Sequence, residues 1–189
     1  MIRVLTVDDH PALRAGLKTV LQAEPGIVPV GAADSAFELW PLLHSTRPDV
    51  VILDLHLPGS NALVLCRTIK AELAPPKVLI YSAYAGPPLV VPAALAGADG
   101  MLSKSVAARD LYAAIREIAG GSSLLPELTA ELRAQALDRL DGEDRELAEA
   151  LLAGRTPAEA GLAPDEVGPR MDRMLDHLQP VQPEAAATG

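Results

Sequence analysis

The sequence predicts an α/β protein, with a doubly wound, five-stranded parallel sheet followed by a smaller all-α domain. Short β-branched runs alternate with helical patterns five times over residues 1–120, which is typical of βαβ units. Residues 121–189 carry helical patterns only. Apolar residues make up 49% of the chain and charged residues 22%, which is typical of a globular protein. With 189 residues, the chain is long enough for one domain of ordinary size and a small second one.

Each expected strand is a short β-branched run that a helix follows. Pro11 suits the first turn of the first helix, and Ser35 and Glu38 have the spacing of a capping box at the second. The fifth helix, over residues 107–119, places its apolar residues on one face and is expected to stop at Gly120. The strands are expected at residues 2–7, 27–32, 50–53, 78–82 and 100–103.

The fourth helix has an unusual sequence. Gly86-Pro87-Pro88 precedes an apolar run, and Pro92 falls inside the helical register. A proline inside a helix costs about 3 kcal/mol, because a hydrogen bond is lost and the ring clashes with the preceding turn. We therefore expect this helix to be short, kinked or mobile. Its apolar run, residues 89–91, is interpreted as core in preference to an exposed partner surface.

The C-terminal part is expected to consist of helices. Residues 120–123 read as a hinge, Pro126 is expected to open a helix that reaches about Leu140, and a further helix over 141–153 should stop at Gly154. One face of a last helix is marked by Val167, Met171, Met174 and Leu178. We divide the chain into a first domain at 1–120, a linker with a helix at 121–139, a small helical domain at 140–179 and a Pro/Ala-rich tail at 180–189 that is expected to be disordered.

Charge is distributed unevenly between the two parts. Residues 1–120 hold 10 Lys and Arg against 11 Asp and Glu, whereas residues 121–189 hold 6 arginines, no lysine and 14 acids. The second part therefore lacks the basic surface that nucleic-acid binding normally requires.

Cysteine and histidine content bounds the compartment and the chemistry. Cys66 is the only cysteine, so the chain forms no internal disulfide and a reducing cytoplasm fits best. No leader-like or membrane-spanning run is present, and we expect a soluble protein without a membrane partner. The four histidines, His10, His44, His56 and His177, have no metal-ligand spacing and are treated as ordinary.

Polar side chains follow four of the expected strands. Asp8 and Asp9 follow the first strand and Asp54 the third, Ser82 ends the fourth, and Lys104 follows the fifth. Each has an ordinary explanation when taken alone, as a helix start, a cap or a surface lysine. Because the carboxyl ends of parallel strands meet at one edge, where such sheets bind ligands, the joint placement predicts a site.

The residue types at this edge suit phosphoryl chemistry. Carboxylate oxygens are the ligands that Mg²⁺ prefers, and Asp9 and Asp54, with Asp8 through a water, are its candidate ligands. A carboxylate can attack a phosphoryl group when the charge on the transferred oxygens is neutralised. The metal and Lys104 would neutralise this charge, and Ser82 would hydrogen-bond a phosphoryl oxygen once it is present.

The chain resembles the response regulators, in particular their NarL/FixJ branch, over residues 1–120. The resemblance implies a CheY-like receiver in which Asp54 is phosphorylated by a sensor histidine kinase, Ser82 is the switch hydroxyl and Lys104 binds phosphate. It also implies that Mg²⁺ is held by Asp8, Asp9, Asp54 and the backbone carbonyl of His56. The matching stretches are Val7-Asp8-Asp9-His10-Pro11, Asp49 to Gly59, Tyr81-Ser82-Ala83 and Ala96 to Lys104.

Two positions depart from the family pattern. Met101 stands where the family usually has an aromatic residue that rotates on activation, and Ala62 replaces a usual glycine. The switch is therefore expected to be altered.

From Leu140 the chain is loosely similar to the family's LuxR-type helix-turn-helix. About four residues of the scaffold helix are missing after Ala160, which is about one turn. The leading face of the reading helix carries Asp165, Glu166, Gly168 and Pro169, and only Arg170 and Arg173 remain as possible DNA-binding residues.

The function expected from these features is that of a two-component response regulator. It accepts a phosphoryl group on Asp54, changes conformation or oligomeric state, with a homodimer expected, and acts mainly through protein contacts. The alternative is a DNA-binding transcriptional regulator of the NarL/FixJ type, although DNA binding is expected to be weak. An enzyme is not expected, since a phosphohydrolase with Asp54 as nucleophile lacks an acid-base carboxylate two residues on, where His56 stands.

Overall fold

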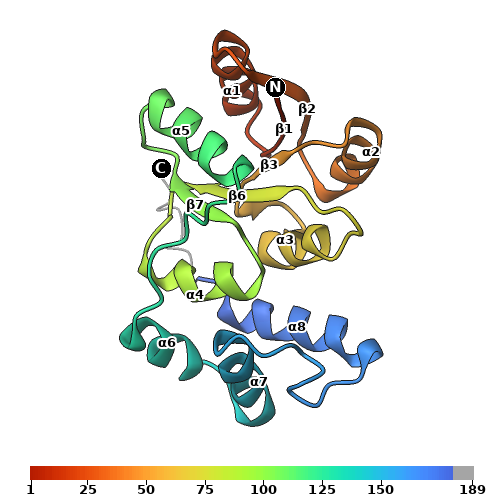
Figure 1. Cartoon of the computed structure of the whole chain (residues 1–189), viewed down its shortest axis with the longest axis vertical. Coiled ribbons are helices and arrows are strands. Elements are labelled where there is room, and N and C mark those ends of the chain that lie inside the picture. The colour runs from red at the N-terminus through yellow and green to blue at the C-terminus, as the bar shows by residue number, and fades with distance from the viewer. Residues whose placement is uncertain (181–189) are drawn as a thin grey trace, which may run out of the picture.

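Five parallel strands form the sheet at the centre of the molecule. In the computed structural model, which describes residues 1–180, they lie in the order β2-β1-β3-β6-β7 (Figure 1). All five agree with the strands expected from the sequence to within one residue at each end, because each β-branched run is bounded by helix or turn signals. Their bounds are β1 Ile2–Val7, β2 Ile27–Ala33, β3 Val50–Leu53, β6 Lys77–Ser82 and β7 Gly100–Ser103.

Helices cover both faces of the sheet. On one face α1 (Pro11–Ala23) and α5 (Ala108–Ala119) bury their apolar stripes against the strands. On the other face lie α2 (Ala36–Thr46), α3 (Ala62–Lys70) and α4 (Pro87–Leu95). A small hairpin of β4 (His56–Leu57) and β5 (Ser60–Asn61) follows β3. This is the doubly wound arrangement that the sequence predicted.

Helix α4 is apolar on all sides, and most of its side chains from Leu89 onward are buried. It runs for nine residues without a break, although Pro92 lies inside it. Leu89, Val90 and Val91 are each at most 2% exposed, so the apolar run is core and not a free partner surface. A helix that is apolar all round requires neighbours all round. Here the sheet lies on one side and the C-terminal helices on the other (Figure 1).

The connection to the C-terminal helices differs from the expectation. Pro126 does not open a helix. Helix α6 (Ala130–Leu137) begins four residues later, after its N-cap Thr129, whose hydroxyl accepts a hydrogen bond from the amide of Leu132. The segment before it is extended, and Leu124 bridges to Gly100 at the edge of the sheet. The Leu124 amide donates to the Asp99 carbonyl at 2.8 Å. The expected hinge is thus followed by residues that the sheet holds in place.

Two further helices complete the described chain. They are α7 (Gly142–Leu152) and α8 (Pro164–Leu178), and in the described chain the residues between them form turns instead of a helix. The roughly four missing residues predicted a scaffold helix shortened by one turn, whereas this segment forms no helix. Gly154, at φ +82°, ends α7 as expected.

The C-terminal helices and the sheet domain share one hydrophobic core. Helices α6, α7 and α8 all contact α4, and α8 also contacts α3. Fully buried side chains of α8, among them Met174, Leu175 and Leu178, belong to the same cluster as Leu89 of α4 and Cys66 of α3. Figure 1 shows the three helices stacked beneath α3 and α4.

Among the described residues, no helix combines the length and apolar character needed to cross a bilayer. The tail that was expected to be disordered lies outside the described residues from position 181 onward.

Candidate functional site

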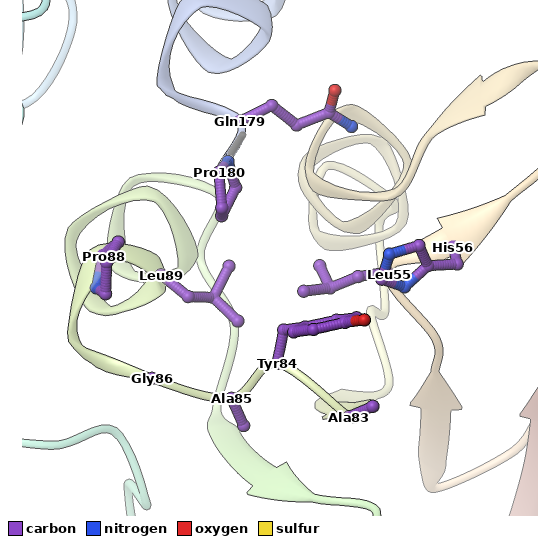
Figure 2. Close-up of a pocket in the computed structure, with 10 residues that line it drawn as sticks. All are labelled: Leu55, His56, Ala83, Tyr84, Ala85, Gly86, Pro88, Leu89, Gln179 and Pro180. Atoms are coloured by element: carbon purple, nitrogen blue, oxygen red, sulfur yellow. The ribbon is translucent and has the colours of Figure 1, made fainter. Parts of the chain in front are cut away.

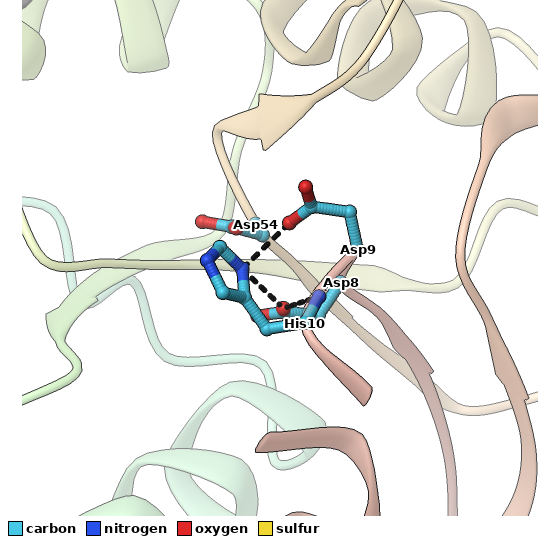
Figure 3. Close-up of side chains that lie close together, drawn as sticks. All are labelled: Asp8, Asp9, His10 and Asp54. Carbon is cyan, nitrogen blue, oxygen red and sulfur yellow. Dashed lines mark hydrogen bonds and ion pairs between the residues drawn. The ribbon is translucent and has the colours of Figure 1, made fainter. Parts of the chain in front are cut away.

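Three carboxylates meet at the carboxyl edge of the sheet. Val7 of β1 is in register with Leu53 of β3, so the residues that follow them, Asp8 and Asp54, emerge side by side. The Asp8 side chain is 2% exposed and that of Asp54 1%, whereas Asp9 is 30% exposed at the rim. Figure 3 shows the three side chains converging on one space.

Lys104 enters the same space from the end of β7. Its Nζ lies 2.7 Å from Asp8 Oδ2 and 2.8 Å from Asp54 Oδ2, and the lysine side chain is only 16% exposed. Burial alone lowers the pKa of a lysine, but the ion pairs with Asp54 and Asp8 outweigh burial and raise the pKa of Lys104. Lys104 is thus held as a cation between the two buried carboxylates.

One lysine does not balance three carboxylates. Asp54 Oδ1 is buried and has no hydrogen-bond partner among the described residues. Oxygen atoms in this condition are costly to bury unless a cation or a donor satisfies them. Hard divalent cations such as Mg²⁺ take oxygen ligands of this kind, so the residues present fit a bound Mg²⁺.

Ser82 and Met101 lie at the neighbouring strands. Ser82 is fully buried, and its Oγ accepts a hydrogen bond from the amide of Tyr84 at 3.2 Å, so the hydroxyl proton is still available to a phosphoryl oxygen. Met101 is half-buried on edge strand β7, and its amide donates to the carbonyl of Leu124. The structure brings Ser82 to the acidic edge, while the linker segment pairs with the backbone at Met101.

A cavity of about 370 Å³ opens beside the acidic site. Figure 2 shows His56 and Tyr84 on one side of it, Leu89 on another, and Pro180 at the end of α8 above them. His56, which lines the cavity, has its Nδ1 3.9 Å from Asp54 Oδ1, so the cavity adjoins the site. Sequence patterns missed it, because its walls come from two loops and the end of a distant helix.

His10 is the residue at the site that sequence reasoning treated as ordinary. Its Nδ1 lies 2.6 Å from Asp9 Oδ1 and 3.3 Å from Asp8 Oδ1 (Figure 3). Its only signal in the sequence was adjacency to the Asp8-Asp9 pair. Cys66, in contrast, is fully buried, and burial raises the pKa of its thiol to about 12, which makes it unreactive.

The arginines nominated for DNA binding are engaged within the C-terminal helices. Arg170 Nε lies 3.0 Å from Asp144 Oδ1, and Arg173 Nε lies 3.4 Å from Asp144 Oδ2. Asp144 is 5% exposed, and Arg170 also pairs with Glu143 at 3.0 Å. Both guanidinium groups therefore form ion pairs with α7.

Helix α8, which the sequence predicted to be the reading helix, lies against α3. Arg67 Nη2 of α3 lies 2.7 Å from Asp172 Oδ1, and Asn61 donates to Asp176 Oδ1 at 2.6 Å. Met171, Met174 and Leu175 of α8 are buried in the core that the helix shares with α3 and α4. In the described structure one face of α8 is therefore covered by α3 and the sheet domain.

Comparison with known proteins gives a consistent set of relatives. The family model described as "Response regulator receiver domain" matches residues 4–116. The DNA-binding transcriptional activator DevR/DosR of Mycobacterium tuberculosis is 34% identical over 166 residues, 82% of this chain and 76% of the relative. The nitrate/nitrite response regulator NarL of Escherichia coli is 35% identical over 69% of this chain, a match that spans 63% of NarL.

Solved structures agree with the sequence relatives. A LuxR-family two-component response regulator from an Aurantimonas species superposes with a TM-score of 0.63 and 32% identity, over 71% of this chain and 97% of that one. The response regulator ChrA of a heme-sensing two-component system superposes with a TM-score of 0.56 and 26% identity, over 93% of this chain and 87% of that one. The second match extends into the C-terminal helices.

Proposed function

This chain belongs to the response regulators of the NarL/LuxR family, and on that premise we propose that it accepts a phosphoryl group on Asp54 from a sensor histidine kinase. The observation that carries the proposal is the state of the Asp54 carboxylate. It is 1% exposed, its Oδ2 pairs with Lys104, and its Oδ1 has no hydrogen-bond partner among residues 1–180.

In the proposed step, a carboxylate oxygen of Asp54 attacks the phosphorus of a phosphohistidine on the kinase. The phosphorus–nitrogen bond breaks, the kinase imidazole leaves, and an acyl phosphate forms. Asp8, Asp9 and Asp54 would hold Mg²⁺, which when bound supplies positive charge to the transferred oxygens. Lys104 supplies further positive charge and Ser82 a hydroxyl donor.

We propose that output runs mainly through protein contacts. Residues 1–120 act as the receiver, 121–139 as the linker and 140–179 as a reduced helix-turn-helix. Arg170 and Arg173 are paired with Asp144, and one face of α8 packs on α3, so the usual DNA-reading surface is not free in this arrangement. The named relative DevR/DosR is a DNA-binding activator, and this supports DNA binding after release of α8 as the alternative.

The same proposal includes a homodimer as the active assembly and a cytoplasmic location. The family relationship supports the homodimer. The single cysteine, Cys66, is a buried free thiol, which is compatible with the reducing conditions of the cytoplasm.

Acetyl phosphate labelling of the full chain tests the acceptor. The intact mass should rise by one phosphoryl group when Mg²⁺ is present, and chelation of the metal should suppress the change. Asp54→Asn should abolish it, while Asp110→Asn, at a half-exposed aspartate of α5, should not. A mass change that survives in Asp54→Asn would place the acceptor elsewhere.

A further inference from the structure

The acidic site has a nitrogen atom among its oxygens. Besides Asp8, Asp9 and Asp54, the group of side chains able to hold a metal ion includes His10, and the candidate ligand atoms all lie within 4.8 Å of one another. We propose that the site also binds a transition-metal cation of the Zn²⁺ class, with His10 Nδ1 as a ligand. This rests on the proposed function, which assigns the same three carboxylates to a metal site.

The spacing of the ligand atoms fits direct coordination. In an octahedral site with bonds of about 2.1 Å, adjacent ligand atoms lie about 3 Å apart, and in a tetrahedral zinc site they lie about 3.4 Å apart. His10 Nδ1 lies 2.6 Å from Asp9 Oδ1 and 3.3 Å from Asp8 Oδ1. Both separations are close to the spacing of two ligands on one ion, so the imidazole can share an ion with either carboxylate after a small shift.

A second observation independent of His10 points to a bound cation. Asp54 is 1% exposed, it faces this space, and its Oδ1 has no hydrogen-bond partner in the described part of the chain. Lys104 pairs with Oδ2 of both Asp54 and Asp8, whereas His10 Nδ1 lies beside the Oδ1 atoms of Asp9 and Asp8. Figure 3 shows the His10 ring next to the three carboxylates.

The His10 side chain contacts the Asp8 and Asp9 carboxylates but does not cap α1. It stands at the N-cap of α1, but its side chain makes no capping hydrogen bond and is 65% exposed. Its backbone amide, which any residue would supply, donates to Asp8 Oδ1 at 2.8 Å. His10→Ala should therefore leave the fold intact.

The mixed ligand set decides which metals gain affinity. Carboxylate and water ligands suit Mg²⁺, whereas imidazole suits Zn²⁺, Cu²⁺, Fe²⁺ and Ni²⁺. An imidazole ligand therefore adds little to the affinity for a hard ion such as Mg²⁺. Zn²⁺ should bind more tightly than Mg²⁺ and occupy the same oxygens of Asp9 and Asp54. It should then compete with Mg²⁺ for the site where Asp54 is proposed to accept phosphate.

Calorimetric titration of the full chain with ZnCl₂ and with MgCl₂ tests the ligand. His10→Ala should weaken Zn²⁺ binding at least about tenfold, the loss that even an outer-shell partner produces, and change Mg²⁺ binding less than about twofold. The matched control is His44→Ala, at a histidine of α2 that is 62% exposed and lies 3.6 Å from Glu72. It should change neither affinity.

Nitrogen-15 NMR of histidine-labelled protein reports the contact directly. Zn²⁺ should shift the Nδ1 resonance of His10, and Mg²⁺ should leave it in place. Equal losses of Zn²⁺ and Mg²⁺ affinity in His10→Ala would overturn the proposal, because His10 would then act only by positioning Asp9. An unchanged Zn²⁺ affinity would overturn it as well.

The labelling experiment keeps the two proposals separable. If Asp54 is not labelled in Mg²⁺ while Zn²⁺ still shifts His10 Nδ1, the acceptor assignment is wrong and the metal site stands. If labelling succeeds and His10→Ala leaves Zn²⁺ binding unchanged, the metal inference alone is wrong.

Discussion

At the scale of single residues, position after a strand carries most of the information about the site. Asp8, Asp54 and Lys104 each follow a strand directly, and parallel register alone brings them to one edge. The contact between His10 and Asp9 has another origin. It depends on how the chain turns into α1 and on the rotamer of one exposed side chain, and neither has a periodic signature in the sequence.

Removal of the Lys104 charge should destabilise the protein most when no metal is present. Lys104→Met would leave the Asp8 and Asp54 carboxylates buried without a cation, a change that typically costs about 3–5 kcal/mol. Mg²⁺ should recover part of the loss, because it neutralises the same oxygens. Urea unfolding of wild type and variant, with and without Mg²⁺, measures both effects.

The pH dependence of this contribution follows from the raised pKa of Lys104. A lysine with a raised folded-state pKa stabilises the fold below its unfolded-state value of about 10.4 and loses that effect as pH rises through the higher folded value. The difference between wild type and Lys104→Met should therefore be constant between about pH 7 and 9. Lys18→Met, at an exposed site on α1, should match wild type throughout. If Lys104→Met lowers the free energy of unfolding by the same amount with and without Mg²⁺, Lys104 does not share its carboxylates with a bound metal.

At the scale of elements, local signals located the strands and most helix ends, whereas tertiary contacts decided the exceptions. The start of α6 was expected at Pro126 because proline favours a first helical turn. Instead, Leu124 forms a bridge with Gly100 at the edge of the sheet, and the helix begins only after its N-cap at Thr129. For α4, Pro92 predicted a short, kinked or mobile helix, and the helix is nine residues long, with most of its side chains from Leu89 onward buried.

The contact between α8 and the α3–α4 face should be a large source of stability. Met174 of α8 is fully buried in the cluster that includes Leu89 of α4, and truncation of a buried methionine to alanine typically costs about 2–5 kcal/mol. Met174→Ala should lower the free energy of unfolding by that amount. It should also speed hydrogen exchange in α4 before it does so in α5, which packs on the opposite face of the sheet.

Leu73→Ala is the control for side-chain truncation, since Leu73 is fully exposed and should contribute little. If Met174→Ala unfolds at the same urea concentration as wild type, the C-terminal helices are not part of the stabilising core.

At the scale of the whole molecule, the C-terminal helices form one body with the receiver. The sequence indicated that the reading helix is chemically poor for DNA, through its acidic face and the 6 arginines against 14 acids over residues 121–189. It did not indicate where the helix lies, because docking on α3 depends on surfaces that are distant in the chain. Arg67 and Asp172, which are 105 positions apart, form one of those contacts.

Reversal of one charge should weaken the docking of α8 on α3 and helps to decide between the two proposed outputs. Arg67→Glu places like charges at the contact with Asp172, and a pair of this partial exposure is worth about 1 kcal/mol or less. Exchange of α8 amides should then rise several-fold, and Asp172→Arg in the same chain should restore the pair and the protection.

DNA affinity in these variants should remain weak. Binding to DNA gains free energy largely from counterion release by Lys and Arg, with a salt slope of about −0.9 per phosphate contacted, and phosphorylation would add about −1.5 to −2 units of charge. Arg170 and Arg173 still face Asp144 after α8 is released, because that contact is internal to the C-terminal helices. A salt titration of wild type, Arg67→Glu and the charge-swapped protein against promoter fragments, each with and without acetyl phosphate, measures this. Two results would contradict output through protein contacts and establish a masked DNA reader. One is tight binding with a steep salt slope in phosphorylated wild type. The other is the same binding in Arg67→Glu that disappears in the charge-swapped protein.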